Sequence, residues 1–220
     1  ESASGKKPFV KLWMHVEFLS VNGEKMSKSL HNYITLTDFL SEHSANAFRW
    51  IVLMHHYRER MNFTDKTIEA AEKNLEDISI FLGKLAIVAK RSSNKKSVGI
   101  NIAKFGSDLN AALEDDFNTP KALAAIFNLM NDISPRIWSF SRPEANKAYK
   151  LLSDSISMFG IDLKLPKIPA KISKLALERE KLRGSKQFIK SDTLRKEING
   201  LGYTVEDTEL GPFVWPKNHS

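Results

Sequence analysis

The sequence predicts a mainly α-helical protein, with an antiparallel helical bundle between a strand–loop–helix segment and a small C-terminal α+β unit. Apolar residues recur three and four positions apart from Ile68 to Phe159, which is the spacing of helices that bury one face. Apolar stretches bounded by turn residues occur near both ends of the chain, before Asn22 and after Gly202, and favour short strands there.

Residues 1–60 are predicted to form the first part. Apolar stretches at Phe9–Met14 and Glu17–Val21 favour two strands, and a polar loop follows the second. Two short helices are then expected, because Thr37 and Ser44 are residue types that cap helix N-termini.

Residues 61–164 are predicted to form the bundle. Each of its four helices carries one apolar stripe, and short connections between such helices favour antiparallel packing. Thr119 is expected to be the N-cap of the third helix, with Pro120 at its first position. The four helices are expected to begin near Thr64, Ile102, Pro120 and Pro143.

Residues 165–220 are predicted to form a small separate unit. Ile172–Arg183 and Ser185–Asn199 favour a pair of helices, which Gly200 and Gly202 end. Tyr203–Val205 and Phe213–Trp215 favour two short strands around a turn.

Composition excludes several classes of protein. The 220 residues include no cysteine, so this chain has no disulfide framework, thiol nucleophile or thiolate metal site. We expect no metal ligands in this chain. No apolar run approaches the roughly 20 residues that span a bilayer, and the first residues do not resemble a signal peptide. We therefore expect a cytoplasmic protein without a membrane partner.

The net charge of +7 favours an acidic partner, with nucleic acid first. Six Lys and Arg residues and no acidic residue lie between Lys84 and Lys104, and a second acid-free stretch runs from Lys164 to Lys174. These stretches can also be solvated linkers, and charge alone does not decide between the two interpretations.

The polar loop Lys25-Met26-Ser27-Lys28-Ser29 is the strongest functional signal. Two ammonium groups and two hydroxyls on one short loop can surround a triphosphate, with lysine acting as a point charge toward phosphate oxygens. In adenylyl transfer such groups stabilise the charge that builds on the leaving pyrophosphate.

This loop matches the KMSKS signature of class I aminoacyl-tRNA synthetases. The surrounding motifs resemble cysteinyl-tRNA synthetases over nearly the whole chain, from about Trp13 to Trp215. These motifs are Trp13-Met14-His15, Val21–Leu30, His56-Tyr57-Arg58, Asp115–Pro120 with Ala122-Leu123, and Gly202–Thr208.

The resemblance implies a C-terminal portion of an enzyme that forms cysteinyl-adenylate and transfers cysteine to tRNA-Cys. It assigns ATP binding to Lys25, Met26, Ser27, Lys28 and Ser29, with the two lysines as catalytic residues and Mg²⁺ expected beside the triphosphate.

The same resemblance implies that the C-terminal unit binds the anticodon through Arg183, Phe188, Asp192 and Asp207. Splayed anticodon bases stack on aromatic or guanidinium planes and form hydrogen bonds along their edges. Each residue also has a structural alternative. Phe188 can belong to the core, Asp192 can pair with a basic neighbour on its helix, and Asp207 can begin the hairpin turn.

The family's HIGH motif and zinc site do not occur in this sequence, and His31 stands where the family often has glycine. We therefore expect cysteine to bind only with the missing catalytic region, and the isolated chain to be inactive. Asp115 and Asp116 are interpreted as capping and bundle residues, and His55 and His56 as structural.

Three other hypotheses remain. The chain can be a stand-alone RNA-binding module without catalysis, which an upstream reading frame lacking the HIGH motif would favour. It can be a cysteine ligase acting on a small amine, although such relatives lack the terminal unit at residues 183–215. A purely structural scaffold leaves the lysine-rich loop unexplained.

Overall fold

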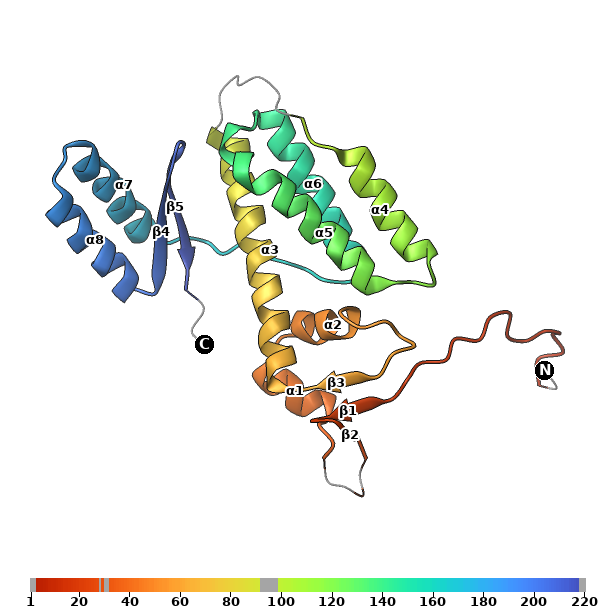
Figure 1. The fold of residues 1–220 in the computed structure, drawn as a ribbon. Helices are drawn as coiled ribbons and strands as arrows, with labels where there is room; N and C mark the ends of the chain where they lie inside the picture. Colours follow the sequence, from red (N-terminus) through yellow and green to blue (C-terminus); the bar gives the residue numbers. More distant parts are fainter. Residues whose placement is uncertain (1–2, 28, 30–31, 92–98, 218–220) are drawn as a thin grey trace.

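The computed structural model describes residues 3–27, 29, 32–91 and 99–217. It is mainly helical, with one small sheet near the start and a hairpin near the end (Figure 1). The elements are β1 (Leu19–Val21), β2 (Glu24–Lys25), α1 (Leu36–Glu42), α2 (Ala45–Leu53), β3 (Met61–Phe63), α3 (Asp65–Arg91), α4 (Ile102–Glu114), α5 (Thr119–Ile133), the 3-10 helix η1 (Ser134–Ser139), α6 (Arg142–Met158), α7 (Ala170–Gly184), α8 (Phe188–Gly200), β4 (Tyr203–Thr208) and β5 (Gly211–Pro216).

The first sheet differs from the prediction. Its strand order is β2-β1-β3, with β1 antiparallel to β2 and parallel to β3. The predicted strand at Phe9–Met14 is wrong, because that segment has no pairing partner among the described residues and Trp13 is 73% exposed. The strand β3 was not predicted, since three residues are too short to display an alternating pattern.

Three helix starts also differ in detail. The N-cap of α1 is Thr35, whose hydroxyl accepts from the Asp38 N–H at 3.1 Å, and not Thr37. The N-cap of α5 is Asn118 and not Thr119. In α6 the capping residue is Ser141, two positions before the proline that predicted the start. In each case an earlier polar residue reaches the exposed N–H groups.

One hydrophobic core joins the first part of the chain to the bundle. It extends from Phe39 to Ile161 and contains the inner faces of α2 to α6. Trp50 of α2 is fully buried and packs edge-on against Phe127 of α5, with ring centroids 6.2 Å apart. The sheet and the two short helices are therefore held on the bundle by the same apolar contacts.

The C-terminal unit has a small core of its own. Apolar side chains of α7, α8 and the β4–β5 hairpin meet between the two layers, and Figure 1 shows this unit beside the C-terminal half of α3. The paired strands, in register from Tyr203 opposite Pro216 to Thr208 opposite Gly211, confirm the predicted α+β character. The buried residues of this core are Ile172, Ala176, Ile198, Val205 and Val214.

The cap of α1 gives a direct test of helix position. We expect Thr35→Ala to lower the free energy of unfolding by about 1 kcal/mol, because the N–H of Asp38 loses its acceptor. Thr37→Ala lies inside the same exposed helix and should change it by less than about 0.5 kcal/mol. Urea unfolding measures both, and equal losses would contradict the assignment.

Candidate functional site

The lysine-rich loop begins at a tight hairpin. Asn22 and Gly23 both have positive φ, 50° and 86°, which is the conformation that an Asn-Gly pair adopts in a two-residue hairpin turn. The hairpin places Lys25 at the end of β2, with its ammonium 3.9 Å from the centroid of the Phe18 ring. Lys28 lies outside the described residues.

Asn32 closes this loop across its base. Its amide nitrogen donates to the Lys25 carbonyl at 3.2 Å, and its amide oxygen accepts from the Ser27 N–H at 2.9 Å. The hydroxyls of Ser27 and Ser29 lie 3.3 Å apart on the same turn, so a cation and two hydroxyls are gathered in one short segment. Such a group suits anionic oxygens. Asn32 was not identified from the sequence, because only the folded loop brings it back to Lys25.

A buried arginine organises the hairpin side of the C-terminal unit. Arg179 of α7 is 1% exposed, and both of its terminal nitrogens donate to the carboxylate of Asp207 on β4. The same carboxylate lies 3.2 Å from Nε of Arg183. The hydrogen bond from Arg179 lowers the pKa of Asp207, although partial burial opposes this shift. Asp207 thus holds Arg183 in place and does not begin the hairpin turn.

The start of α8 is an exposed apolar surface. Phe188 is 54% exposed, so the alternative that placed it in the core is wrong. Phe188 is the first residue of α8, directly after the connection from α7. Ile189 beside it is 86% exposed and was not identified from the sequence, where an apolar residue gives no sign of exposure.

Asp192 lies on the same side of α8 as Phe188, because the two are four residues apart. Its side chain is exposed and forms no ion pair within the described part of the chain. The alternative in which it pairs with a basic neighbour on its helix is therefore not what the structure contains. Of the four predicted anticodon residues, the structure brings Arg183 into contact with Asp207, and places Phe188 and Asp192 on one face.

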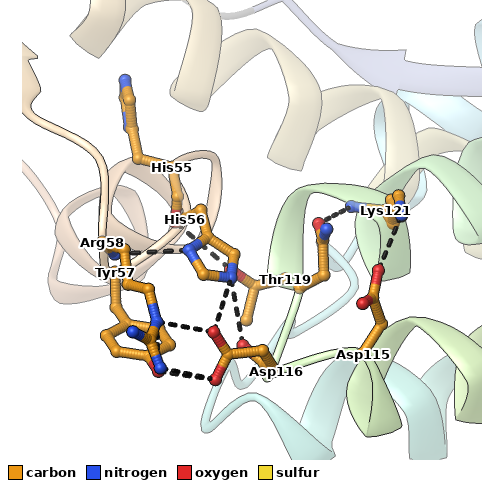
Figure 2. Close-up of polar contacts among 9 residues, drawn as sticks. His55, His56, Tyr57, Arg58, Asp115, Asp116, Thr119 and Lys121 are labelled. Atoms are coloured by element: carbon orange, nitrogen blue, oxygen red, sulfur yellow. Dashed lines mark hydrogen bonds and ion pairs between the residues drawn. The ribbon is translucent and has the colours of Figure 1, made fainter. Parts of the chain in front are cut away.

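A polar cluster ties the loop after α2 to the turn between α4 and α5 (Figure 2). The Tyr57 hydroxyl donates to Oδ1 of Asp116 at 2.6 Å, and Nε of Arg58 lies 2.6 Å from its Oδ2. The His56 ring donates from Nε2 to the Asp116 backbone carbonyl at 3.0 Å. Asp116 and Phe117 both have positive φ, 54° and 53°, an unusual backbone for residues other than glycine that the cluster helps to hold.

The electrostatics of this cluster favour fixed charges over proton transfer. The hydrogen bond from Tyr57, with those from Arg58, lowers the pKa of Asp116, and the same bond raises the pKa of Tyr57. Asp115 points elsewhere and forms an ion pair with Lys121 at 2.7 Å. Asp116 was interpreted from the sequence as a capping or bundle residue. It joins two segments 58 residues apart, while Asn118 caps the helix.

Nothing in the described part of the chain suits a structural metal. No group of three or more His, Cys, Asp or Glu side chains there could hold an ion, and the sequence has no cysteine. The described residues therefore do not offer the ligands that a zinc site like that of the cysteinyl-tRNA synthetases would need. Among the described residues, no helix is long and apolar enough to cross a membrane.

Comparisons with family models match two segments of this chain. Residues 1–73 match the family described as tRNA synthetases class I (C) catalytic domain, and residues 109–164 match the DALR domain. The cysteine–tRNA ligase of Caldicellulosiruptor saccharolyticus is 33% identical over 97% of this chain and 48% of its own length. That of Persephonella marina is 33% identical over 98% of this chain and 50% of its own.

The chain belongs to the cysteine–tRNA ligase family. It spans about half the length of the curated ligases that it matches, including that of Methanosarcina acetivorans, which is 33% identical over 97% of this chain and 47% of its own. The matched class I segment contains the lysine-rich loop, and the DALR segment contains α5 and α6 with the end of α4.

A solved structure agrees in fold with this cysteine–tRNA ligase family member. The crystal structure of the LeuRS–tRNA–LeuAMS ternary complex from Agrobacterium radiobacter K84 has a TM-score of 0.54 and 22% identity, covering 66% of this chain and 20% of that one. At this identity the likeness concerns the fold alone.

The contacts of Asp116 with Tyr57 and Arg58 predict a contribution to stability that is lost in acid. Since its folded pKa is depressed, Asp116 contributes stability above its ordinary pKa of 3.8 and loses it as the pH falls through the folded value. We expect Asp116→Asn to lower the thermal unfolding midpoint at pH 7, and the difference from the wild type to vanish at the acid end. Asp115→Asn, whose carboxylate pairs within the α4–α5 turn, should lower it less. Equal losses in the two variants would contradict the proposed role of Asp116 in joining the two segments.

The contact between buried Arg179 and Asp207 predicts a loss of stability when Asp207 is replaced. Asp207→Asn should lower the free energy of unfolding by about 1–3 kcal/mol, because Arg179 is left with a weaker partner in a buried position. Asp192→Asn serves as the control and should change it by less than about 0.5 kcal/mol. Urea unfolding followed by circular dichroism measures both, and an Asp207 variant as stable as the control would refute this role.

Proposed function

We propose that this chain supplies the ATP-phosphate loop and the tRNA-binding parts of a cysteine–tRNA ligase. The complete enzyme would form cysteinyl-adenylate from cysteine and ATP and then transfer cysteine to tRNA-Cys. One observation carries the proposal: the similarity to a curated cysteine–tRNA ligase extends over 97% of the chain, and so includes the loop, the bundle and the terminal unit.

The proposed ATP site is the segment Lys25–Ser29. Lys25 and Lys28 would neutralise the charge that develops on the leaving pyrophosphate, while Ser27 and Ser29 would donate hydrogen bonds to phosphate oxygens. The amide of Asn32 supports this role, because it holds the backbone on both sides of Met26. Mg²⁺ would accompany the triphosphate.

The proposed anticodon site is the exposed surface of the terminal unit. Phe188 and the guanidinium of Arg183 offer planes on which unstacked bases can lie, and Asp192 offers acceptors for base N–H groups. Asp207 would act chiefly by orienting Arg183, since its carboxylate already accepts from Arg179. Exposure of the Phe188 ring supports this use.

In this proposal the chain divides into residues 1–60 at the end of the catalytic region, the bundle at 61–164 and the anticodon-binding unit at 165–220. The bundle would lie along the tRNA, and the acid-free stretches that border it would contact phosphates. With tRNA and ATP as its partners, the protein would act in the cytoplasm.

Binding of tRNA-Cys at a fixed salt concentration tests the anticodon site. We expect a tRNA-Cys with a substituted anticodon to bind more weakly, and Phe188→Ala to weaken cognate binding about 5- to 100-fold through lost stacking. Phe9→Ala, which removes a similarly exposed ring far away in the sequence, is the control. Equal affinity for the two tRNAs would refute the anticodon-reading role.

A second assay separates the ligase proposal from a stand-alone RNA-binding module. The isolated chain should show no cysteine-dependent exchange between ATP and pyrophosphate, because no described side-chain group can hold a zinc ion that would select the thiol. Addition of the remaining catalytic region should restore exchange. If no such region exists in the reading frame, tRNA binding alone remains, as the RNA-binding alternative requires.

A further inference from the structure

The terminal unit approaches α3 most closely at a glycine. Gly83 is buried near the middle of the C-terminal half of α3, and the indole of Trp215 occupies the space where a side chain would begin. A Cβ atom at position 83 would overlap Cζ3 of Trp215 and lie 3.0 Å from Cη2. Because an indole ring is rigid, any other residue at this position would displace the ring and with it the strand β5.

Gly83 lowers the stability of its own helix. It is the one glycine in the sequence Asp65–Arg91, which is otherwise rich in good helix formers. Glycine in a helix interior is less favourable than alanine, because it loses more conformational freedom on folding. Its presence at the point of contact therefore agrees with a requirement for close approach and not with a requirement of the helix.

Aromatic and ionic contacts surround this point. Trp215 stacks on Phe213 with centroids 5.7 Å apart, and Phe213 packs against Trp138 of η1 at 6.2 Å. Next to the glycine, Nζ of Lys84 pairs with Glu206 of β4 at 2.7 Å and lies 5.5 Å from the Phe213 centroid. Both strands of the hairpin are thus held against the bundle.

A second contact lies two turns further along α3. Arg91 donates from Nη1 to the backbone carbonyl of Leu210 at 3.0 Å, at the tip of the hairpin. Positions 83 and 91 are about 12 Å apart along the helix axis. Two contacts at this separation fix both the position and the direction of the hairpin on α3.

We propose that Gly83 is a positioning residue for anticodon recognition, because its contact with Trp215 sets where the α7–α8 surface stands relative to the lysine-rich loop. This inference rests on the proposed function. Figure 1 shows β2, which leads into the loop, near the N-terminal end of α3, and the terminal unit beside the C-terminal half of α3. A single RNA that reaches both ends can be read only when this spacing is kept.

The test is anticodon discrimination, measured as the ratio of affinities for tRNA-Cys and an anticodon-substituted tRNA-Cys at one salt concentration. Gly83→Ala should reduce this ratio at least fivefold while the helix content by circular dichroism is unchanged. Gly106→Ala is the matched control, because a Cβ atom at this α4 glycine meets nothing within 4 Å. The control should keep the wild-type ratio.

Trp215→Phe provides a second variant, in case Gly83→Ala does not fold. Its smaller ring should also reduce discrimination, and Gly83→Ala added to it should cause a smaller further loss than in the wild type. A folded Gly83→Ala that discriminates as the wild type does, or that loses affinity equally for both tRNAs, would overturn the inference. A wild type without discrimination would instead refute the anticodon-reading function itself, and the inference with it.

Discussion

Among the described residues, the long helix α3 is the element on which both ends of the structure pack, since α2, β3, α6, η1 and β5 all contact it. Its inner face buries Ile78, Leu82 and Leu85 in the core that also holds α2, α5 and α6, so the sheet with the lysine-rich loop is fixed at one end. The hairpin of the terminal unit lies on the other end through Gly83 and Arg91. A helix of 27 residues is about 40 Å long. The two proposed binding surfaces are thereby held apart by one rigid element.

The bundle was predictable because its signal is local and long. Apolar residues at helical spacing identify α3 to α6, and the resulting stripes imply a common core. Shorter features were harder to predict from the sequence. The three residues of β3 pair with β1 across about 40 positions, and Phe9–Met14 has the composition of a strand without a partner to complete it. Caps shifted by one or two residues, since several polar residues precede each helix and geometry selects one of them.

In the candidate site, too, some residues could be identified from the sequence and others only from the fold. The segment Lys25–Ser29 could be identified from the sequence, because its chemistry resides in five consecutive residues. The partners that shape each site come from elsewhere in the fold: Asn32 closes the loop, and Arg179 holds Asp207 from another element. Exposure of Phe188 contradicted the alternative that placed it in the core, since the sequence does not show whether another element covers an apolar side chain.

The central claim is that α3 holds the lysine-rich loop and the anticodon-binding unit at one fixed separation. These 220 residues include no cysteine, so spin labels on Lys66→Cys at the start of α3 and Glu197→Cys of α8 report the distance between that end of α3 and the terminal unit without interference from other thiols. The account predicts a single narrow distance distribution, unchanged when tRNA-Cys is added. A broad distribution that narrows only with tRNA-Cys would contradict it, because the terminal unit would then be positioned by the RNA and not by α3.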